Sequence, residues 1–128
     1  MLSQKQTPCE DENIRHENTA YVIFDSLLSS LPSGVRGMGH DRHLVFAGPD
    51  LDIHVKITEV NRRKEMYGQL IWHTPTDQSV MIRLINGETR RETEPGPLGE
   101  FSFDEISARS VSLEIVLPFQ RVIAAFDA

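Results

Sequence analysis

Alternation of apolar and polar residues with a period of two constrains the fold of this chain more than any other feature of its sequence. In the clearest run, residues 51–58, apolar residues at odd positions alternate with Asp52, His54 and Lys56. Successive side chains of a β-strand point to opposite faces, so such a strand buries one face and exposes the other. Three later runs repeat the pattern, with inward residues Met66, Gly68, Leu70 and Trp72, then Val80, Ile82 and Leu84, then Val111, Leu113, Ile115 and Leu117. The pattern predicts antiparallel sheets whose inner faces pack together.

Turn signals connect these runs. Residues 60–64 predict a turn between the run 51–58 and the strand around Gly68, so these two strands are expected to form a hairpin. Asn86-Gly87 is the strongest hairpin signal, because Asn and Gly accept the positive φ angles of a type I′ turn. It leads into the polar run 88–94, which we expect on a sheet edge, where charges discourage strand addition. Together the runs predict a mainly β protein, an antiparallel two-sheet β-sandwich of seven or eight strands.

One N-terminal amphipathic helix is predicted ahead of the sandwich. Asn18 or Thr19 can cap it, and Pro32-Ser33-Gly34 ends it after about Leu31. Its apolar face is formed by residues at helical spacing, namely Tyr21, Phe24, Leu27, Leu28 and Leu31. The chain is therefore expected to divide into a mobile, apolar-poor tail at 1–17, the helix and a Gly-rich connector at 18–42, and the β-sandwich domain at 43–128.

Four short segments follow one another in an order that matches a known type of β-sandwich. They are Tyr67-Gly68-Gln69-Leu70-Ile71 with its Gly-Gln step, the alternating segment 79–84, the polar segment from Thr93 to Phe103, and the alternating segment 111–115. This order resembles the carboxypeptidase regulatory-like domain, a small transthyretin-like β-sandwich. The resemblance covers about half of the chain and implies a two-sheet fold.

A second likeness concerns the segments FDSLLSSLPSGVR (24–36) and RHLVFAGPDLDIHVKI (42–57), which precede the Gly-Gln strand. This order of parts resembles small proteins associated with bacterial extracytoplasmic-function sigma factors and zinc-finger anti-sigma proteins. It implies an accessory or regulatory partner in such a signalling system. The His-x3-Cys-x2-Cys zinc motif of the anti-sigma module does not occur in this sequence, so the likeness does not extend to sigma-factor sequestration through that module.

Charge and composition exclude several classes of function. The chain has 128 residues, enough for one domain, and its net charge of −6 disfavours binding to nucleic acid. No run approaches the roughly 20 apolar residues needed to cross a bilayer, so no membrane association is expected. The single cysteine, Cys9, cannot form an internal disulfide, and the N-terminus lacks the order of a secretion signal. These features favour a cytoplasmic location.

The predicted helix is the candidate site of specific function. Its apolar face can dock on its own sandwich or in the groove of another protein, because amphipathic helices are recognised through the same spacing. We therefore predict a non-catalytic protein–protein interaction module without cofactors, and a homodimer is a further possibility. The residues predicted to contact the partner are Phe24, Leu27, Leu28 and Leu31, with Arg36 and Arg42 as a polar rim.

The alternative is a small metal-dependent hydrolase that uses His40, His43 and His54. Catalytic zinc sites use three protein ligands, and Asp41 or Asp52 is available as an oxygen donor. Against this interpretation, His40 and His43 lie in or beside the Gly-rich connector, and neither a cysteine nor a Glu-x-x-His pattern supports them. Surface histidines are the favoured interpretation.

Overall fold

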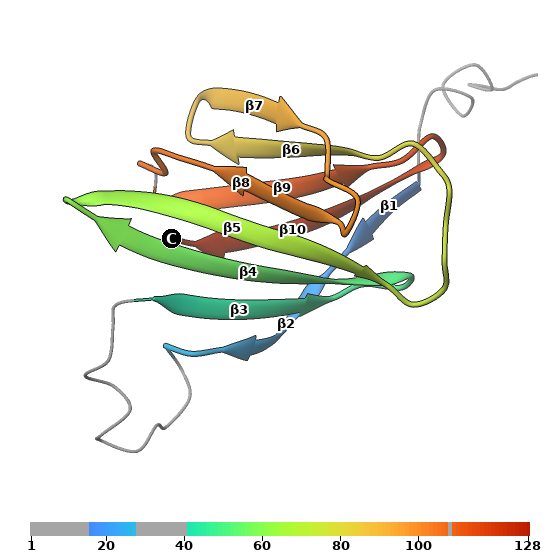
Figure 1. The fold of residues 1–128 in the computed structure, drawn as a ribbon, viewed down its shortest axis with the longest axis horizontal. Coiled ribbons are helices and arrows are strands. Elements are labelled where there is room, and N and C mark those ends of the chain that lie inside the picture. Colours follow the sequence, from blue (N-terminus) through green and yellow to red (C-terminus); the bar gives the residue numbers. More distant parts are fainter. Residues whose placement is uncertain (1–15, 28–40, 108) are drawn as a thin grey trace, which may run out of the picture.

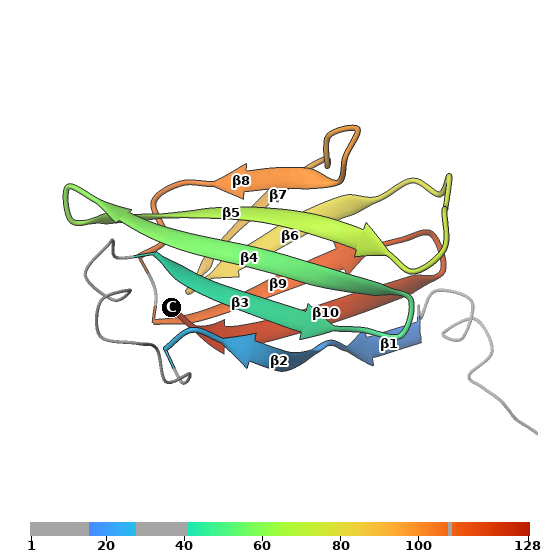
Figure 2. The same cartoon turned by 60° about the horizontal axis from the view of Figure 1, so that its bottom comes forward.

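The computed structural model describes residues 16–27, 41–107 and 109–128, which form ten strands in two sheets. Sheet A contains, in spatial order, β1 (His16–Thr19), β10 (Gln120–Asp127), β9 (Ser110–Val116), β6 (Met81–Asn86) and β7 (Thr89–Thr93). Sheet B contains β2 (Tyr21–Asp25), β3 (Arg42–Ala47), β4 (Leu51–Val60), β5 (Arg63–Trp72) and β8 (Glu100–Phe103). Only β1 and β10 pair in parallel, whereas every other pair of neighbours is antiparallel. The two sheets lie face to face (Figure 1 and Figure 2).

The core lies between the inner faces of the two sheets, where the alternation of the sequence places it. Ile53 of β4, Leu84 of β6 and Leu113 of β9 are completely buried, and each such side chain contributes roughly 1.5–3 kcal/mol to folding. The ring centroids of Phe46 in β3 and Phe126 in β10 are 5.6 Å apart across the core. The predicted two-sheet architecture is confirmed, although the described residues form ten strands rather than seven or eight. They include no helix, and therefore none that is long and apolar enough to cross a membrane.

The helix predicted from Asn18 or Thr19 is wrong for residues 18–25, because 18–19 belong to strand β1 and 21–25 to strand β2. The segment 20–24 reads Ala-Tyr-Val-Ile-Phe, and β-branched and aromatic residues of this kind favour strands. The chain changes from sheet A to sheet B at Ala20, which is buried and whose N–H donates to the carbonyl of Ile123 at 2.9 Å. Residues 28–31 of the predicted helix lie outside the described residues.

The predicted hairpin between β4 and β5 is confirmed. Val60 pairs with Arg63, so the loop consists of Asn61 and Arg62 alone. Their φ angles are 53° and 68°, and a type I′ turn requires positive φ at both central positions. The second central position normally holds glycine, so Arg62 occupies a position that disfavours its side chain.

The hairpin predicted at Asn86-Gly87 is also present, but its turn differs from the prediction. Asn86 pairs with Thr89, so Gly87 and Glu88 form the loop, and of these only Gly87 has a positive φ, 69°. Glycine in the first central position is typical of a type II′ turn. Asn86 instead ends β6 with a buried side chain, whose amide donates to the carbonyl of Glu105 at 3.3 Å.

Gly68 leaves room for an aromatic ring over β5. It pairs with Phe101 of β8, and a Cβ atom at position 68 would lie 2.2 Å from the tip of that ring. Any other residue at this position would displace Phe101, which is buried. The glycine of the Gly-Gln step is therefore a packing requirement between β5 and β8.

Ion pairs cross the outer face of sheet A. The buried carboxylate of Glu114 in β9 accepts from Arg83 of β6 at 3.1 Å and lies 3.6 Å from Arg121 of β10. The same two arginines also contact Glu92 of β7, at 2.9 Å, and Glu17 of β1. Acid and base thus alternate across all five strands, and each partly buried charge has a partner of opposite sign.

Candidate protein-binding surface

Strand β2 exposes apolar side chains along one edge of sheet B. The exposed fractions are 68% for Tyr21, 43% for Val22, 64% for Ile23 and 41% for Phe24. Among the described strands β2 pairs only with β3, so its other edge presents backbone N–H and C=O groups to the surroundings. Such an edge is a template for pairing with another chain.

The other sheet edges are protected in ways that β2 is not. Strand β7 contains Arg90, Arg91 and Glu92, β8 is four residues long and begins with Glu100, and β1 is four residues long and contains Glu17. Charged side chains and short length both discourage pairing at an edge. Residues 20–24 have no charge, Asp25 ends β2, and a bulge lies between Val22 and Phe24.

An ion pair fixes the end of β2 to β3. The guanidinium of Arg42 donates from Nε and Nη2 to the two carboxylate oxygens of Asp25, at 3.1 and 2.8 Å. A third nitrogen of Arg42 donates to the backbone carbonyl of Asp127 in β10. The backbone N–H of Leu27 donates to the same carboxylate at 3.0 Å. The hydrogen bonds from Arg42 outweigh burial and lower the pKa of Asp25.

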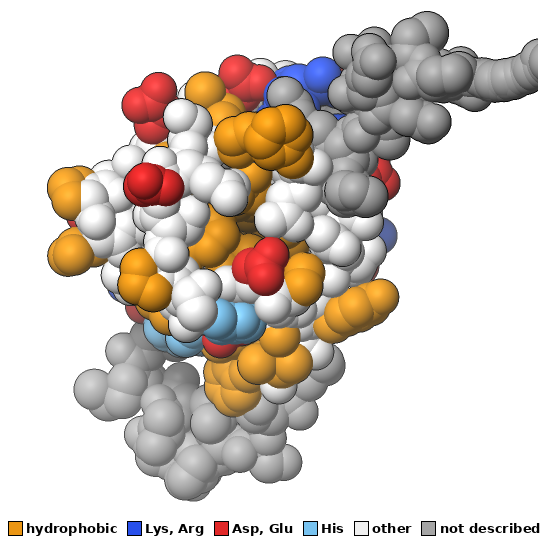
Figure 3. Space-filling model, turned by 90° about the vertical axis from the view of Figure 1, so that its right-hand side faces the viewer, with side chains coloured by type: hydrophobic (Ala, Val, Ile, Leu, Met, Phe, Trp, Pro, Cys, Tyr) orange, Lys and Arg blue, Asp and Glu red, His pale blue; other side chains and the backbone are white. Residues whose placement is uncertain are grey.

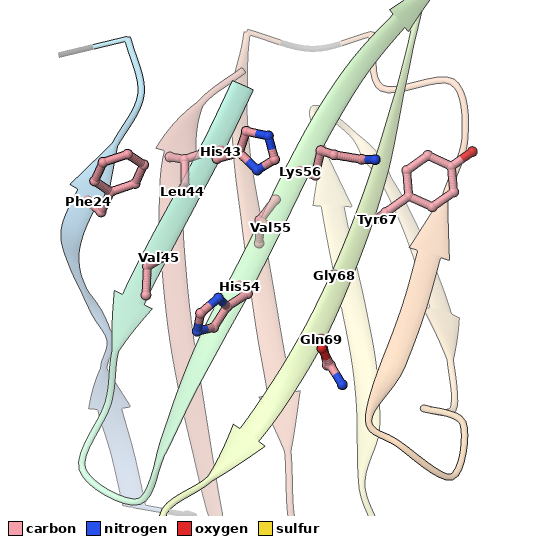
Figure 4. A pocket seen from close by; sticks show the side chains of 10 residues that line it. All are labelled: Phe24, His43, Leu44, Val45, His54, Val55, Lys56, Tyr67, Gly68 and Gln69. Carbon is pink, nitrogen blue, oxygen red and sulfur yellow. The ribbon is translucent and has the colours of Figure 1, made fainter. Parts of the chain in front are cut away.

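A shallow groove of about 430 Å³ runs over the outer face of sheet B beside β2. Phe24, Val45, His54 and Gln69 form one row across β2, β3, β4 and β5, because each pairs with the next in the sheet register. Figure 4 shows these side chains, with Phe24 at one side of the groove and Gln69 on the far strand. The groove therefore continues the apolar edge onto the sheet face.

The second row of the groove is formed by His43, Lys56 and Tyr67 on β3, β4 and β5. The ammonium of Lys56 lies 5.7 Å from the ring centroid of Tyr67, within the range of a cation–π contact. The hydroxyl of Tyr67 donates to the carboxylate of Glu65 at 2.8 Å, and this hydrogen bond raises the pKa of Tyr67. This row can form hydrogen bonds and charged contacts with a bound chain.

The predicted metal ligands are only partly brought together. His43 and His54 lie on neighbouring strands on the outer face, whereas His40 lies outside the described residues. Asp41 accepts a hydrogen bond from Thr58 at 3.0 Å, and Asp52 lies 3.1 Å from His73, so both carboxylates have other partners. The described residues contain no group of three or more His, Cys, Asp or Glu placed to hold a metal ion.

The residues predicted to contact a partner have different positions in the structure. Phe24 lies in β2, and Leu27, two residues after the end of β2, is 66% exposed. Arg42, predicted as polar rim, forms the ion pair with Asp25 and leaves 15% of its side chain exposed. The other predicted residues, Leu28, Leu31 and Arg36, lie outside the described part of the chain.

Sequence reasoning placed Tyr21 on an apolar helix face and missed the contribution of Val22 and Ile23. Helical spacing selects Tyr21, Phe24 and Leu27 and leaves the residues between them on the polar face, although Val22 and Ile23 are apolar. A run of four apolar residues without charge was the available signal, because β-branched and aromatic residues in short runs indicate strands.

Exposed apolar residues at the end of the sandwich away from the β4–β5 turn are more dispersed than those of β2. Figure 3 views the end of the sandwich that lies away from the β4–β5 turn and shows hydrophobic side chains at several separate places. Phe119, between β9 and β10, is 81% exposed, and Leu98, between β7 and β8, is 73% exposed. Scattered exposed apolar residues are common on protein surfaces, whereas β2 presents four in succession.

No family model, no curated protein and no solved structure matches this chain.

Proposed function

We propose that this protein is a non-catalytic protein-interaction module that binds its partner by adding a strand to β2. The observation that carries the proposal is the apolar, uncharged edge of sheet B, where four successive side chains are 41–68% exposed. In strand addition, backbone hydrogen bonds provide affinity and pockets for alternate side chains provide specificity.

The groove supplies the second part of this binding mode. A strand added beside β2 directs every other side chain toward the outer face of sheet B. Phe24 and Val45 provide apolar contact there, and His54 and Gln69 provide hydrogen-bonding groups. Phe24 and Leu27 therefore remain partner-contacting residues in this proposal, but from an edge strand rather than a helix.

The biological setting that we propose rests on the sequence resemblance. A module of the carboxypeptidase regulatory-like type, with the segment order of proteins associated with bacterial sigma and anti-sigma factors, fits an accessory or regulatory partner of a cytoplasmic signalling protein. The two-sheet architecture is compatible with that resemblance.

The test places a charge on the β2 edge. Ile23→Lys adds a cation where strand addition needs an uncharged edge, and Ile71→Lys is the matched control on the outer face of β5, a strand paired on both sides. The tagged full-length chain and both variants are used to capture partners from the cell that makes the protein, and the mass of each is measured in solution.

Recovery of the same protein by the wild type and by Ile71→Lys, with loss of at least about tenfold in Ile23→Lys, supports the proposal. A doubled mass that only Ile23→Lys abolishes supports the same edge with a second copy as partner. Equal recovery by all three forms contradicts the proposal, as does the absence of any partner together with a monomeric mass.

A further inference from the structure

A cleft with basic walls lies at the end of the sandwich that contains the β4–β5 turn. Its volume is about 630 Å³, and it is lined by that turn, the β8–β9 connection and the end of β10. Figure 1 shows the β4–β5 turn and the β8–β9 connection at the same end of the molecule. The charged side chains of its lining are Arg62, Arg63, Lys64, Arg109 and Glu105. A chain with a net charge of −6 therefore places four cationic side chains and one acidic side chain in this lining.

Acidic side chains neutralise the positive charge of this cleft poorly. Arg63 lies 3.8 Å from Glu105, and the side chains of both residues are more than 60% exposed, so this contact is weak. Arg62, Lys64 and Arg109 form no ion pair with any described residue. By contrast, Arg42, Arg83, Arg91 and Arg121 all have carboxylate partners.

Unfavourable backbone conformations gather at the same cleft. Asn61, Arg62 and Glu105 are the non-glycine residues with positive φ among those described, at 53°, 68° and 53°. Asparagine tolerates a positive φ, whereas for arginine and glutamate this conformation is sterically unfavourable. Conformations of this kind cluster at ligand-binding sites, where the surrounding structure holds them in place.

Hydrogen bonds hold the two loops of the cleft together. The N–H of Ile106 donates to the carbonyl of Lys64 at 2.9 Å, which joins the β8–β9 connection to β5. The buried amide of Asn86 donates to the carbonyl of Glu105 at 3.3 Å. The N–H of Ala128 donates to the carbonyl of Arg109 at 2.7 Å. The backbones that carry the cations are therefore fixed relative to one another.

We propose that this cleft binds a polyvalent phosphate-type oxyanion, either free or as the phosphate group of a small molecule. Guanidinium groups match the geometry of phosphate oxygens with two parallel hydrogen bonds, and three arginines and a lysine suit more than one negative charge. The lining residues are separate from those of β2 and its groove, so this inference does not depend on the proposed partner binding.

The experiment measures binding of pyrophosphate, ADP and acetate to the full chain by calorimetry at low ionic strength. Arg62→Gly removes one cation and also relieves the positive-φ strain, so this variant is expected to fold at least as well as the wild type. Arg109→Gln removes a second cation. The control is Arg90→Gln, because Arg90 is an exposed arginine of β7 outside the cleft lining.

Pyrophosphate and ADP are expected to bind the wild type, and acetate is not. Each cleft variant should weaken binding about tenfold, and Arg90→Gln should leave it within about twofold. Tighter binding of ADP than of pyrophosphate would identify a nucleotide as the source of the phosphate, and equal affinity would identify the free anion.

A thermal shift experiment separates binding from stability. Arg62→Gly should unfold at a higher temperature than the wild type without ligand, yet gain a smaller increase from pyrophosphate. The proposal is overturned if no phosphate compound binds the wild type. It is also overturned if Arg90→Gln weakens binding as much as the two cleft variants do.

Discussion

At the scale of single residues, the pair Asp25–Arg42 decides how β2 is held. The residues are 17 positions apart, and neither charge stands out in a sequence with 25% charged residues. Their side chains are 8% and 15% exposed, so removal of one partner leaves a charge largely shielded from water. No periodicity argument could find this pair, because it depends on the β2–β3 register.

We expect Asp25→Asn to lower the free energy of unfolding by about 3 kcal/mol at pH 7. The pKa of Asp25 is lowered from its ordinary 3.8 in the folded state, so the unfolded chain binds a proton more readily. The stabilisation is therefore complete above about pH 4 and is lost as the pH falls through the folded-state pKa. Urea unfolding of both forms between pH 3 and pH 7 measures it, with Asp77→Asn in the exposed β5–β6 connection as control.

The control should change stability by less than about 0.5 kcal/mol at every pH. A difference between the wild type and Asp25→Asn that persists undiminished at pH 3 would show that the carboxylate charge is not the stabilising group.

Gly68 gives a second prediction at this scale. Gly68→Ala should cost about 1–3 kcal/mol, because the new methyl group meets the ring of Phe101 and not open space. The cost should fall in a Phe101→Leu background, where the tip of the ring is gone, and urea unfolding of the four proteins measures this coupling. An equal cost in both backgrounds would place the effect in the backbone and not in the ring contact.

At the scale of elements, the strands that the sequence identifies are those buried on one face. β4, β5, β6 and β9 alternate because their inner residues meet the opposite sheet. Most of their predicted inward residues are buried, and Trp72 and Val80 are partly buried against the core. β7 consists of polar residues, as predicted for an edge strand, and it lies at the edge of sheet A. Burial of one face requires apolar residues at alternate positions of a strand, and this alternation is visible in the sequence.

Strands β1 and β2 could not be identified in this way. An edge strand that exposes side chains on both faces has no alternation, and Tyr21, Phe24 and Leu27 then match helical spacing by chance. The location of β1 depends on pairing with β10, which is distant in the sequence. The location of β2 depends on pairing with β3, which follows it in the chain. The apolar character of the candidate site was therefore predictable, whereas its secondary structure and its position at a sheet edge were not.

At the scale of the whole molecule, the two outer faces of the sandwich differ in how their polar groups are satisfied. On sheet A the alternating ion pairs centred on Glu114 engage charges from every strand. Sheet B has a groove, and one row of its side chains continues from Phe24 of the exposed β2 edge. The same fold thus has one face whose charges pair with one another and one face whose groove adjoins the apolar β2 edge, and we infer that partner binding occurs on the second.

The most direct test of partner binding at β2 is amide hydrogen exchange of residues 21–25, measured in the free protein and in complex with the captured partner. The amides of β2 that do not bond to β3 should exchange rapidly in the free protein and become strongly protected in the complex, because a partner strand supplies their missing acceptors. Unchanged exchange of these amides in a complex that protects residues elsewhere would contradict the account.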